Sequence, residues 1–367
     1  MRTAWPPDGD GKSFRPGGPG MRLVSPLLRR VVFPVLSRSG YFRKMGDSVP
    51  VVVTYHGIFP EGYKPESLVL DGHLVTADMF RRHMQLLKTK YNLISPQTFL
   101  AHLQGKDECP PRSVLLTCDD GLLNVLTGML PIIAEMDLQF LLFLTGASAL
   151  DSGAMLWYEK LYLWLDQGKG EVRVQSSGAE KPLVARAGNP DAQWRPLIRA
   201  LSRFSTAQRE TLLCEMRTQL GISESWESEY SQNEFLRRRF FTVNASEARA
   251  LAQAGMTIGS HTMSHPMLSQ LPEDLAYAEM TESRTRLESA IGAPVWSLAY
   301  PFGDGESAGV REAELAERAG FQCAFVNTEL GVRAQFAVPR IHVSSRTSVA
   351  ELDAHVSGFY RSLRAAL

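Results

Sequence analysis

The stretch SVLLTCDDG, residues 113–121, is an apolar run that ends in two aspartates and a glycine. A short apolar run bounded by a turn residue is typical of a fully buried strand. Adjacent carboxylates at the end of such a strand repel each other and resist leaving water, so both are costly unless they are used. Consecutive strand side chains point to opposite faces, so Asp119 and Asp120 share one site only where the chain turns, which Gly121 permits. The stretch predicts a buried strand whose carboxyl end holds a positively charged partner.

Strand-like and helix-like segments alternate on both sides of this stretch. Apolar and β-branched runs predict strands at 49–55, 93–94, 113–118, 140–144, 256–260, 295–300, 322–326 and 337–341. Apolar residues at helical spacing predict helices at 76–90, after Pro96, and at 124–136, 245–254, 272–291 and 309–319. Either Thr76 or Asp78 is the expected cap of the first helix, and Asn244 and Glu247 resemble a capping box. This alternation is typical of a parallel sheet covered by helices.

The polar residues of interest directly follow predicted strands. They are His56 after the first strand, Asp119 and Asp120 after the third, His261 after the fifth, Pro301-Phe302-Gly303 after the sixth, and His342 at the end of the last. In parallel α/β barrels the carboxyl ends of the strands meet at one rim, where catalytic residues gather. We therefore predict a distorted (β/α) barrel with parallel strands and one site on its rim. An open, doubly wound sheet is the alternative, and it too places a site at strand ends.

Residues 151–240 interrupt this rhythm and divide the predicted barrel into residues 49–150 and 241–367. They predict an inserted, mostly helical cap with helices at 156–164 and 206–220 and a hairpin at 171–185 around Ser177-Gly178. An insertion after a rim loop can cover a site and shape its groove. The aromatic side chains of Trp157, Tyr158 and Trp164 either stack on a sugar ring or form a small core for the insertion.

Charge and the N-terminal segment limit the classes of partner. Lysine plus arginine equals aspartate plus glutamate at 39 each, so no overall field attracts nucleic acid. Residues 1–48 comprise a tail at 1–20, predicted to be disordered, and a basic apolar segment at 21–44. That segment is too interrupted to span a bilayer and lacks a signal-peptide core, which favours a cytoplasmic protein. It either lies on a membrane surface, with its arginines against lipid headgroups, or packs as a helix on the catalytic domain.

His261 and His265 have a spacing that one helical turn or a tight loop brings to one face. Two imidazoles and one carboxylate make three protein ligands around a zinc-like ion and leave one position open, as in catalytic zinc sites. With the aspartate pair, they predict one divalent metal ion, with zinc preferred and cobalt or nickel as alternatives. One carboxylate would bind the ion while its neighbour accepts a proton from the attacking water. The alternative for the histidines is a hydrogen-bonded loop pair.

Three motifs resemble those of one family. TCDDG at 117–121, HTMSH at 261–265 and YPFG at 300–303 are similar, in this order, to the first three motifs of the polysaccharide deacetylases, carbohydrate esterase family 4. The resemblance covers residues 49–150 and 240–345 and implies a metal-dependent hydrolase that removes acetyl groups from N-acetylated sugars. It implies that Asp119 is the general base, that Asp120 joins both histidines on the metal, and that the backbone N–H of Phe302 donates to the oxyanion.

The sequence departs from the family pattern at several positions. Cys118 stands where an aromatic residue usually precedes the aspartates, which is interpreted as a packing substitution, and the fourth motif is not found. Ala299 stands where the third motif usually carries the arginine that orients the base. Arg340, from the last predicted strand, either supplies that guanidinium or is a surface or loop-tying arginine.

The general acid that protonates the leaving amine is also open, and an imidazole suits the task. His342 lies late in the chain, where many family members carry their catalytic histidine. His56 follows the first strand, as in relatives whose motif order is permuted and which also begin with a Tyr-His step, and we prefer it. The remaining candidates, His73, His83 and His102, are interpreted as structural or solvated.

The residues and the resemblance together predict a metal-dependent N-deacetylase. Its substrate would be an N-acetylhexosamine unit of a polysaccharide, an oligosaccharide or a glycolipid precursor, as in cell envelope metabolism. One alternative keeps the scaffold but hydrolyses a non-sugar amide, such as a cyclic imide or ureide. The other alternative is a catalytically inactive carbohydrate-binding protein.

Overall fold

The computed structural model describes residues 26–45, 49–65, 67–150, 152–175, 182–328 and 334–366. The tail predicted at residues 1–20 and the turn predicted around Ser177-Gly178 lie outside these residues. No helix in the described ranges has the length and apolar character needed to cross a bilayer.

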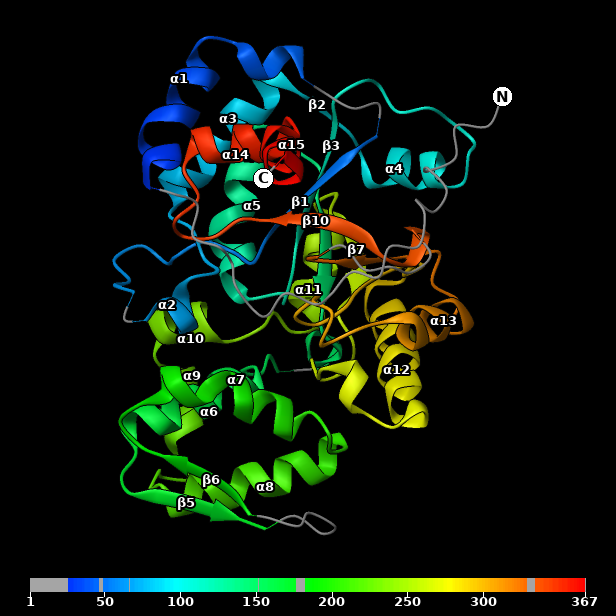
Figure 1. Ribbon diagram of the computed structural model, residues 1–367. Coiled ribbons are helices and arrows are strands. Elements are labelled where there is room, and N and C mark those ends of the chain that lie inside the picture. The colour runs from blue at the N-terminus through cyan, green and yellow to red at the C-terminus, as the bar shows by residue number, and fades with distance from the viewer. Residues whose placement is uncertain are drawn as a thin grey trace.

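An eight-stranded parallel sheet forms the centre of the molecule, and all of its strands except β2 close into a ring (Figure 1). In ring order the strands are β1 (Val51–Tyr55), β10 (Val338–His342), β9 (Cys323–Val326), β8 (Ser297–Ala299), β7 (Thr257–Ser260), β4 (Leu141–Leu144) and β3 (Ser113–Cys118). The pairing of β1 with β3 closes the ring, so the (β/α) barrel is confirmed and the open sheet is wrong. The short strand β2 (Asn92–Leu93) pairs with the start of β3. The same edge of β3 pairs with β4 nearer its carboxyl end.

Helices form the outer layer around the ring (Figure 1). They are α2 (Leu68–Asp71), α3 (Ala77–Lys90), α4 (Pro96–Leu103), α5 (Leu130–Glu135), α11 (Ala245–Gln253), α12 (Glu273–Ile291), α13 (Val310–Arg318), α14 (Val349–Val356) and α15 (Phe359–Ala366). Thr76 caps α3 by accepting from the N–H of Met79, and Asn244 and Glu247 form the capping box of α11. The helix predicted at 124–136 is two segments, because a π-helical turn (η3, Val125–Met129) precedes α5.

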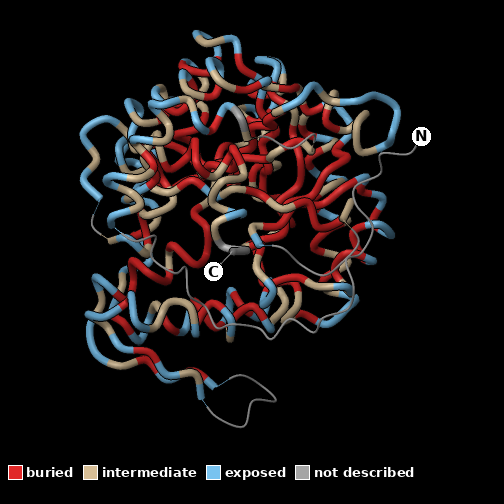
Figure 2. Tube along the Cα trace, turned by 45° about the horizontal axis from the view of Figure 1, so that its top comes forward, coloured by how far each residue is buried: buried red, intermediate tan, exposed pale blue. Residues whose placement is uncertain are grey.

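Apolar strand side chains alternate between two core layers, and the buried residues gather at the centre of the molecule (Figure 2). One layer fills the ring and includes Val52, Leu115, Leu141, Phe143, Phe325 and Val338, with Phe99 of α4 packed on Phe325. Strand neighbours of these residues, including Val53, Val114, Leu116 and Leu142, pack against the surrounding helices. The filled interior makes the ring a packed core, and the polar side chains lie at the strand ends.

The insertion between β4 and β7 folds around its own cluster of buried residues. It contains α6 (Trp157–Gln167), β5 (Glu171–Val174), β6 (Leu183–Arg186), α7 (Pro190–Leu201), α8 (Thr206–Gln219), α9 (Trp226–Gln232) and α10 (Glu234–Phe240). The antiparallel pairing of β5 with β6 confirms the predicted hairpin. Trp157, Tyr158 and Trp164 are all buried in this cluster, which confirms the alternative of a small core for the insertion over stacking on a sugar ring. The domain limits themselves stay a prediction.

Candidate active site at the barrel rim

The aspartate pair lies at the carboxyl end of β3, where the backbone passes through two left-handed residues. Asp120 has a φ of 72° and Gly121 a φ of 70°. A Cβ added at Gly121 would lie 2.6 Å from the Cδ2 atom of Leu144, so this position needs glycine for its conformation and for its packing. The turn places both carboxylates in one buried site, with Asp119 1% and Asp120 2% exposed.

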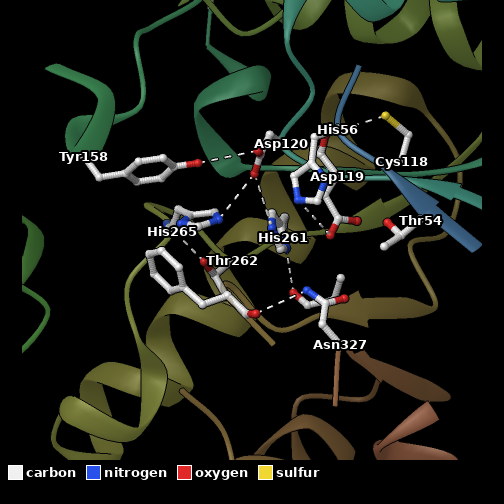
Figure 3. Close-up of polar contacts among 12 residues, drawn as sticks. Thr54, His56, Cys118, Asp119, Asp120, Tyr158, His261, Thr262, His265 and Asn327 are labelled. Atoms are coloured by element: carbon white, nitrogen blue, oxygen red, sulfur yellow. Dashed lines mark hydrogen bonds and ion pairs between the residues drawn. The ribbon is translucent and has the colours of Figure 1, made fainter. Parts of the chain in front are cut away.

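Asp120, His261 and His265 converge on one point (Figure 3). Oδ1 of Asp120 lies 3.4 Å from Nε2 of His261 and 3.3 Å from Nε2 of His265. One ligand atom from each residue lies within 4.8 Å of the others, and all three residues are buried. Nδ1 of His261 is 2.7 Å from the carbonyl oxygen of Ala299, to which it donates, and this leaves Nε2 as the free ligand atom.

The donor set of this cluster fits a divalent metal ion. Among the described residues Oδ1 of Asp120 has no hydrogen-bond partner, which is unusual for a buried carboxylate oxygen. Burial tends to raise the pKa of Asp120, but His261 and His265 outweigh it and hold the pKa well below its usual range. An ionised oxygen that faces two imidazole nitrogens in a buried site is the arrangement that a cation satisfies.

Asp119 is held by Arg340 of β10. Nη1 of Arg340 is 2.7 Å from Oδ1 of Asp119, and Nη2 is 2.7 Å from Oδ2, so the two side chains form a bidentate pair. Burial tends to raise the pKa of Asp119, but Arg340, His261 and His56 outweigh it and leave the pKa below its usual value. The structure therefore brings the predicted guanidinium to the predicted base, and Arg340 is buried rather than a surface arginine.

Three histidines lie together beside Asp119. Nε2 of His56 is 3.9 Å from Oδ2 of Asp119, and the buried Nδ1 of His56 has no partner among the described residues. The rings of His342 and His73 lie 4.9 Å and 5.4 Å from the ring of His56. Burial lowers the pKa of His56 in spite of the nearby aspartates, which favours its neutral form. Both candidates for the general acid are therefore present, and His56 is the one in contact with the base.

Of the three histidines interpreted as structural or solvated, only His73 lies at the candidate site. His83 is a structural residue, because its ring nitrogens contact Tyr55 and the carbonyl of Thr347. His102 accepts a hydrogen bond from the backbone N–H of Cys109 at the end of α4. His73 was expected to be structural or solvated, but it lies at the site beside His56. Its position after the short helix α2 gave no strand end from which this could be predicted.

Asn327 contacts both the third motif and Arg340. Phe302 and Gly303 both have a φ of 64°, and the side-chain N–H of Asn327 donates to the carbonyl of Phe302. A Cβ at Gly303 would lie 2.8 Å from the backbone nitrogen of Asn327. The Oδ1 atom of Asn327 accepts from Nε of Arg340 at 3.2 Å, so Asn327 links the third motif to the arginine. No sequence motif indicated this role for Asn327, although it directly follows the strand predicted at 322–326.

Left-handed backbone is concentrated in the three motifs. Non-glycine residues with positive φ include Asp120, Thr262, His265 and Phe302. Such conformations cost of order 1–3 kcal/mol each and persist where the surroundings over-determine them, which is common at functional sites. Here they turn the strand-end loops back over the rim, so the motif residues face one another.

The inserted helix α6 contributes a wall of the site that sequence reasoning missed. The hydroxyl of Tyr158 is 3.5 Å from Oδ2 of Asp120, and its ring lies 4.8 Å from that of His265 (Figure 3). The indole N–H of Trp157 donates to the carbonyl oxygen of His265 at 3.2 Å. Both aromatic residues therefore support the metal-ligand candidates instead of offering a face to a substrate.

One segment of the chain matches a known protein family. The polysaccharide deacetylase family model matches residues 225–324, which include both histidines and the third motif. The resemblance to the polysaccharide deacetylase family is thereby confirmed. The matched segment does not include the aspartate pair, which the barrel brings to the histidines in space. No curated protein matches the sequence.

Solved structures share the fold at low sequence identity. A deacetylase of Streptococcus pyogenes, PplD, in complex with acetate has a TM-score of 0.51 and 16% identity, over 83% of this chain and 96% of that one. IcaB from Ammonifex degensii has a TM-score of 0.51 and 16% identity, over 85% of this chain and 97% of that one. At this identity the likeness supports the fold, and the roles of individual site residues stay predictions.

Proposed function

We propose that this protein is a metal-dependent N-deacetylase acting on N-acetylhexosamine units of a polysaccharide, oligosaccharide or glycolipid. One observation carries the proposal, namely that two adjacent carboxylates have different partners. Asp120 faces two imidazoles, while Asp119 is held outside that cluster by a guanidinium. This division separates a metal ligand from a base, as amide hydrolysis by an activated water requires.

Asp120, His261 and His265 would hold the ion. A divalent metal, zinc in our proposal, supplies a positive charge that polarises the amide carbonyl and makes water more acidic. Asp119 keeps its negative charge near neutral pH, because Arg340 lowers its pKa, and it accepts the proton of the attacking water. The left-handed turn at Phe302 belongs to the rim loop, and we assign its backbone N–H to the developing oxyanion.

His56 would deliver a proton to the leaving amine. Its Nε2 lies 3.9 Å from Oδ2 of Asp119, so the base and the proposed acid share one side of the site. A proton taken from water by Asp119 can reach the amine nitrogen through this imidazole with a short movement. We keep His342 as the alternative acid, because its ring lies against that of His56.

The test is acetate release from N-acetylglucosamine oligomers, measured beside hydrolysis of a cyclic ureide. We expect acetate release that stops after removal of metal with a chelator and returns when zinc is added back. Asp119→Asn should abolish turnover while the metal content stays unchanged, whereas the exposed Asp107→Asn should have no effect. Turnover of the ureide alone, or full activity of Asp119→Asn, would contradict the proposal.

A further inference from the structure

The N-terminal helical segment has one face fixed to the barrel. This segment consists of η1 (Leu28–Val32), α1 (Phe33–Arg38) and η2 (Tyr41–Lys44). Phe33 is fully buried, and its ring meets those of Phe359 and Tyr360 edge-on at 6.4 Å each. Polar contacts add to this packing, because Arg29 pairs with Glu351 at 2.9 Å and the hydroxyl of Ser37 donates to Asp353. The segment is therefore docked on α14 and α15, as one of the two sequence-based alternatives expects.

The opposite face of the same segment, together with Leu27 at its N-cap, is apolar and exposed. Leu27 is 63%, Val31 51%, Val35 59% and Tyr41 45% exposed. The first three are spaced by four residues, so they form one stripe along the helix. Of the nine large exposed apolar residues in the described chain, these four lie in one short segment. A cluster of this kind on an otherwise polar surface indicates a contact with something that covers it.

The charged residues of this N-terminal segment are all basic. Between Asp10 and Asp47 the sequence contains no acidic residue, although acidic and basic residues balance over the whole chain. Arg30, Arg38 and Arg43 are exposed beside the stripe, and none of them forms an ion pair with a described residue. An apolar stripe flanked by unpaired arginines matches a surface that is apolar inside and negatively charged at its edge.

We propose that this N-terminal face, formed by Leu27, Arg30, Val31, Val35, Arg38, Tyr41 and Arg43, binds the surface of an anionic phospholipid bilayer. The apolar side chains would enter the headgroup region while the arginines contact lipid phosphates. A second copy of the chain fits less well, because a two-fold contact would set these arginines against one another without an acidic partner. The face lies at the end of the molecule away from the cap helices α6 to α9, so membrane contact leaves the cap uncovered (Figure 1).

Vesicle flotation tests the proposal on the full chain without any substrate, so its outcome is independent of the proposed deacetylation. Phosphatidylcholine vesicles are compared with vesicles that also contain phosphatidylglycerol. We expect binding to the anionic vesicles, weakened by added salt, and little binding to the neutral ones. Changing Arg30, Arg38 and Arg43 to Gln together should lower the partition coefficient by roughly 100-fold, since each arginine contributes a similar electrostatic attraction.

A second variant tests the apolar stripe. Leu27→Ser, Val31→Ser and Val35→Ser combined should also abolish flotation, while the helical circular dichroism and the melting temperature stay as in the parent protein. The matched control changes Leu68, Val184 and Val310 to Ser, because these apolar residues are exposed elsewhere. Failure of the parent protein to float with anionic vesicles would overturn the proposal, as would equal loss of binding in the control. Dimerisation of the parent protein that the stripe variant removes, without vesicle binding, would assign the face to a second copy instead.

Discussion

Arg340→Met leaves the Asp119 carboxylate buried without the guanidinium that contacts both of its oxygens. Methionine keeps most of the volume of the side chain, so the change tests charge more than packing. Both residues are nearly inaccessible, at 5% and 1% exposed, and the contacts are 2.7 Å long. Removing one partner of such a buried pair costs about 3–5 kcal/mol in the free energy of unfolding, because the remaining charge is left uncompensated.

The pH dependence of this loss has a definite sign. In the parent protein the pKa of Asp119 lies below its usual value, so the pair stabilises the fold above the unfolded pKa of about 3.9, and this stability is lost as pH falls through the folded pKa. Without Arg340, burial should raise the pKa above that value. The variant is then most destabilised near neutral pH, and the deficit shrinks as acid protonates Asp119.

Urea unfolding at several pH values measures this effect, and the acid limb of kcat/KM provides a second readout. We expect the limb to move to higher pH by roughly 1–3 units, the range that a neighbouring opposite charge produces. In Asp119→Asn/Arg340→Met the second substitution should cost much less, which a double-mutant cycle reports directly. Exposed Arg82→Met is the control. A loss below about 1 kcal/mol for Arg340→Met, with an unmoved acid limb, would refute the assigned role of the pair.

Three further substitutions test the neighbouring groups. Asp120→Ala should abolish binding of the metal ion measured by elemental analysis, because it removes one of three ligands, and retention of a full equivalent would contradict the ligand set. Tyr158→Phe should raise the dissociation constant for zinc by roughly 10-fold, the effect expected for a group that orients a ligand, and an unchanged constant would show that the hydroxyl only fills space. His56→Gln should lower kcat by roughly 10²–10⁴-fold and remove the basic limb of the pH profile, whereas a larger loss for His342→Gln would transfer the role of general acid to His342.

The strands of the barrel could be predicted from the sequence because each is a short apolar run with a turn signal at its end. The exclusion of β2 from the ring could not, because it depends on which part of the β3 edge is already paired with β4. Helices of the insertion were missed where local patterns are weak. Pro196 lies inside α7, and α9 reads WESEYSQ, which has no apolar periodicity. The helices α7 and α9 are stabilised by packing against the buried residues of the insertion. A local sequence pattern does not encode such long-range packing.

The residues of the candidate site also fall into a group that the sequence could predict and a group that it could not. The aspartates and His261 could be found because they directly follow strands, and His265 follows from its spacing to His261. Tyr158 could not, because it reaches the site from the inserted helix α6 and has an ordinary sequence context. Asn327 directly follows the strand predicted at 322–326, so its strand-end position was a usable signal, but it belongs to no motif that drew attention to it. Tyr158 is the second residue of α6, whose aromatic residues resemble those of any small core, and its polar contact with Asp120 depends on how the cap sits on the rim.

Curvature of the sheet explains how Arg340 reaches Asp119, although the resemblance to the deacetylase motifs predicts an arginine at position 299 instead. Neighbouring strands are about 4.8 Å apart, so in a flat sheet β10 and β3, which flank β1, would be separated by about 10 Å. In the ring the side chains of both strands turn inward, and the guanidinium of Arg340 lies only 5.5 Å from the ring centre of Phe143 on β4. Arg340 therefore reaches Asp119 across β1. A comparison by sequence position alone finds an incomplete motif at Ala299, whereas the barrel completes the site from a strand on the other side of Asp119.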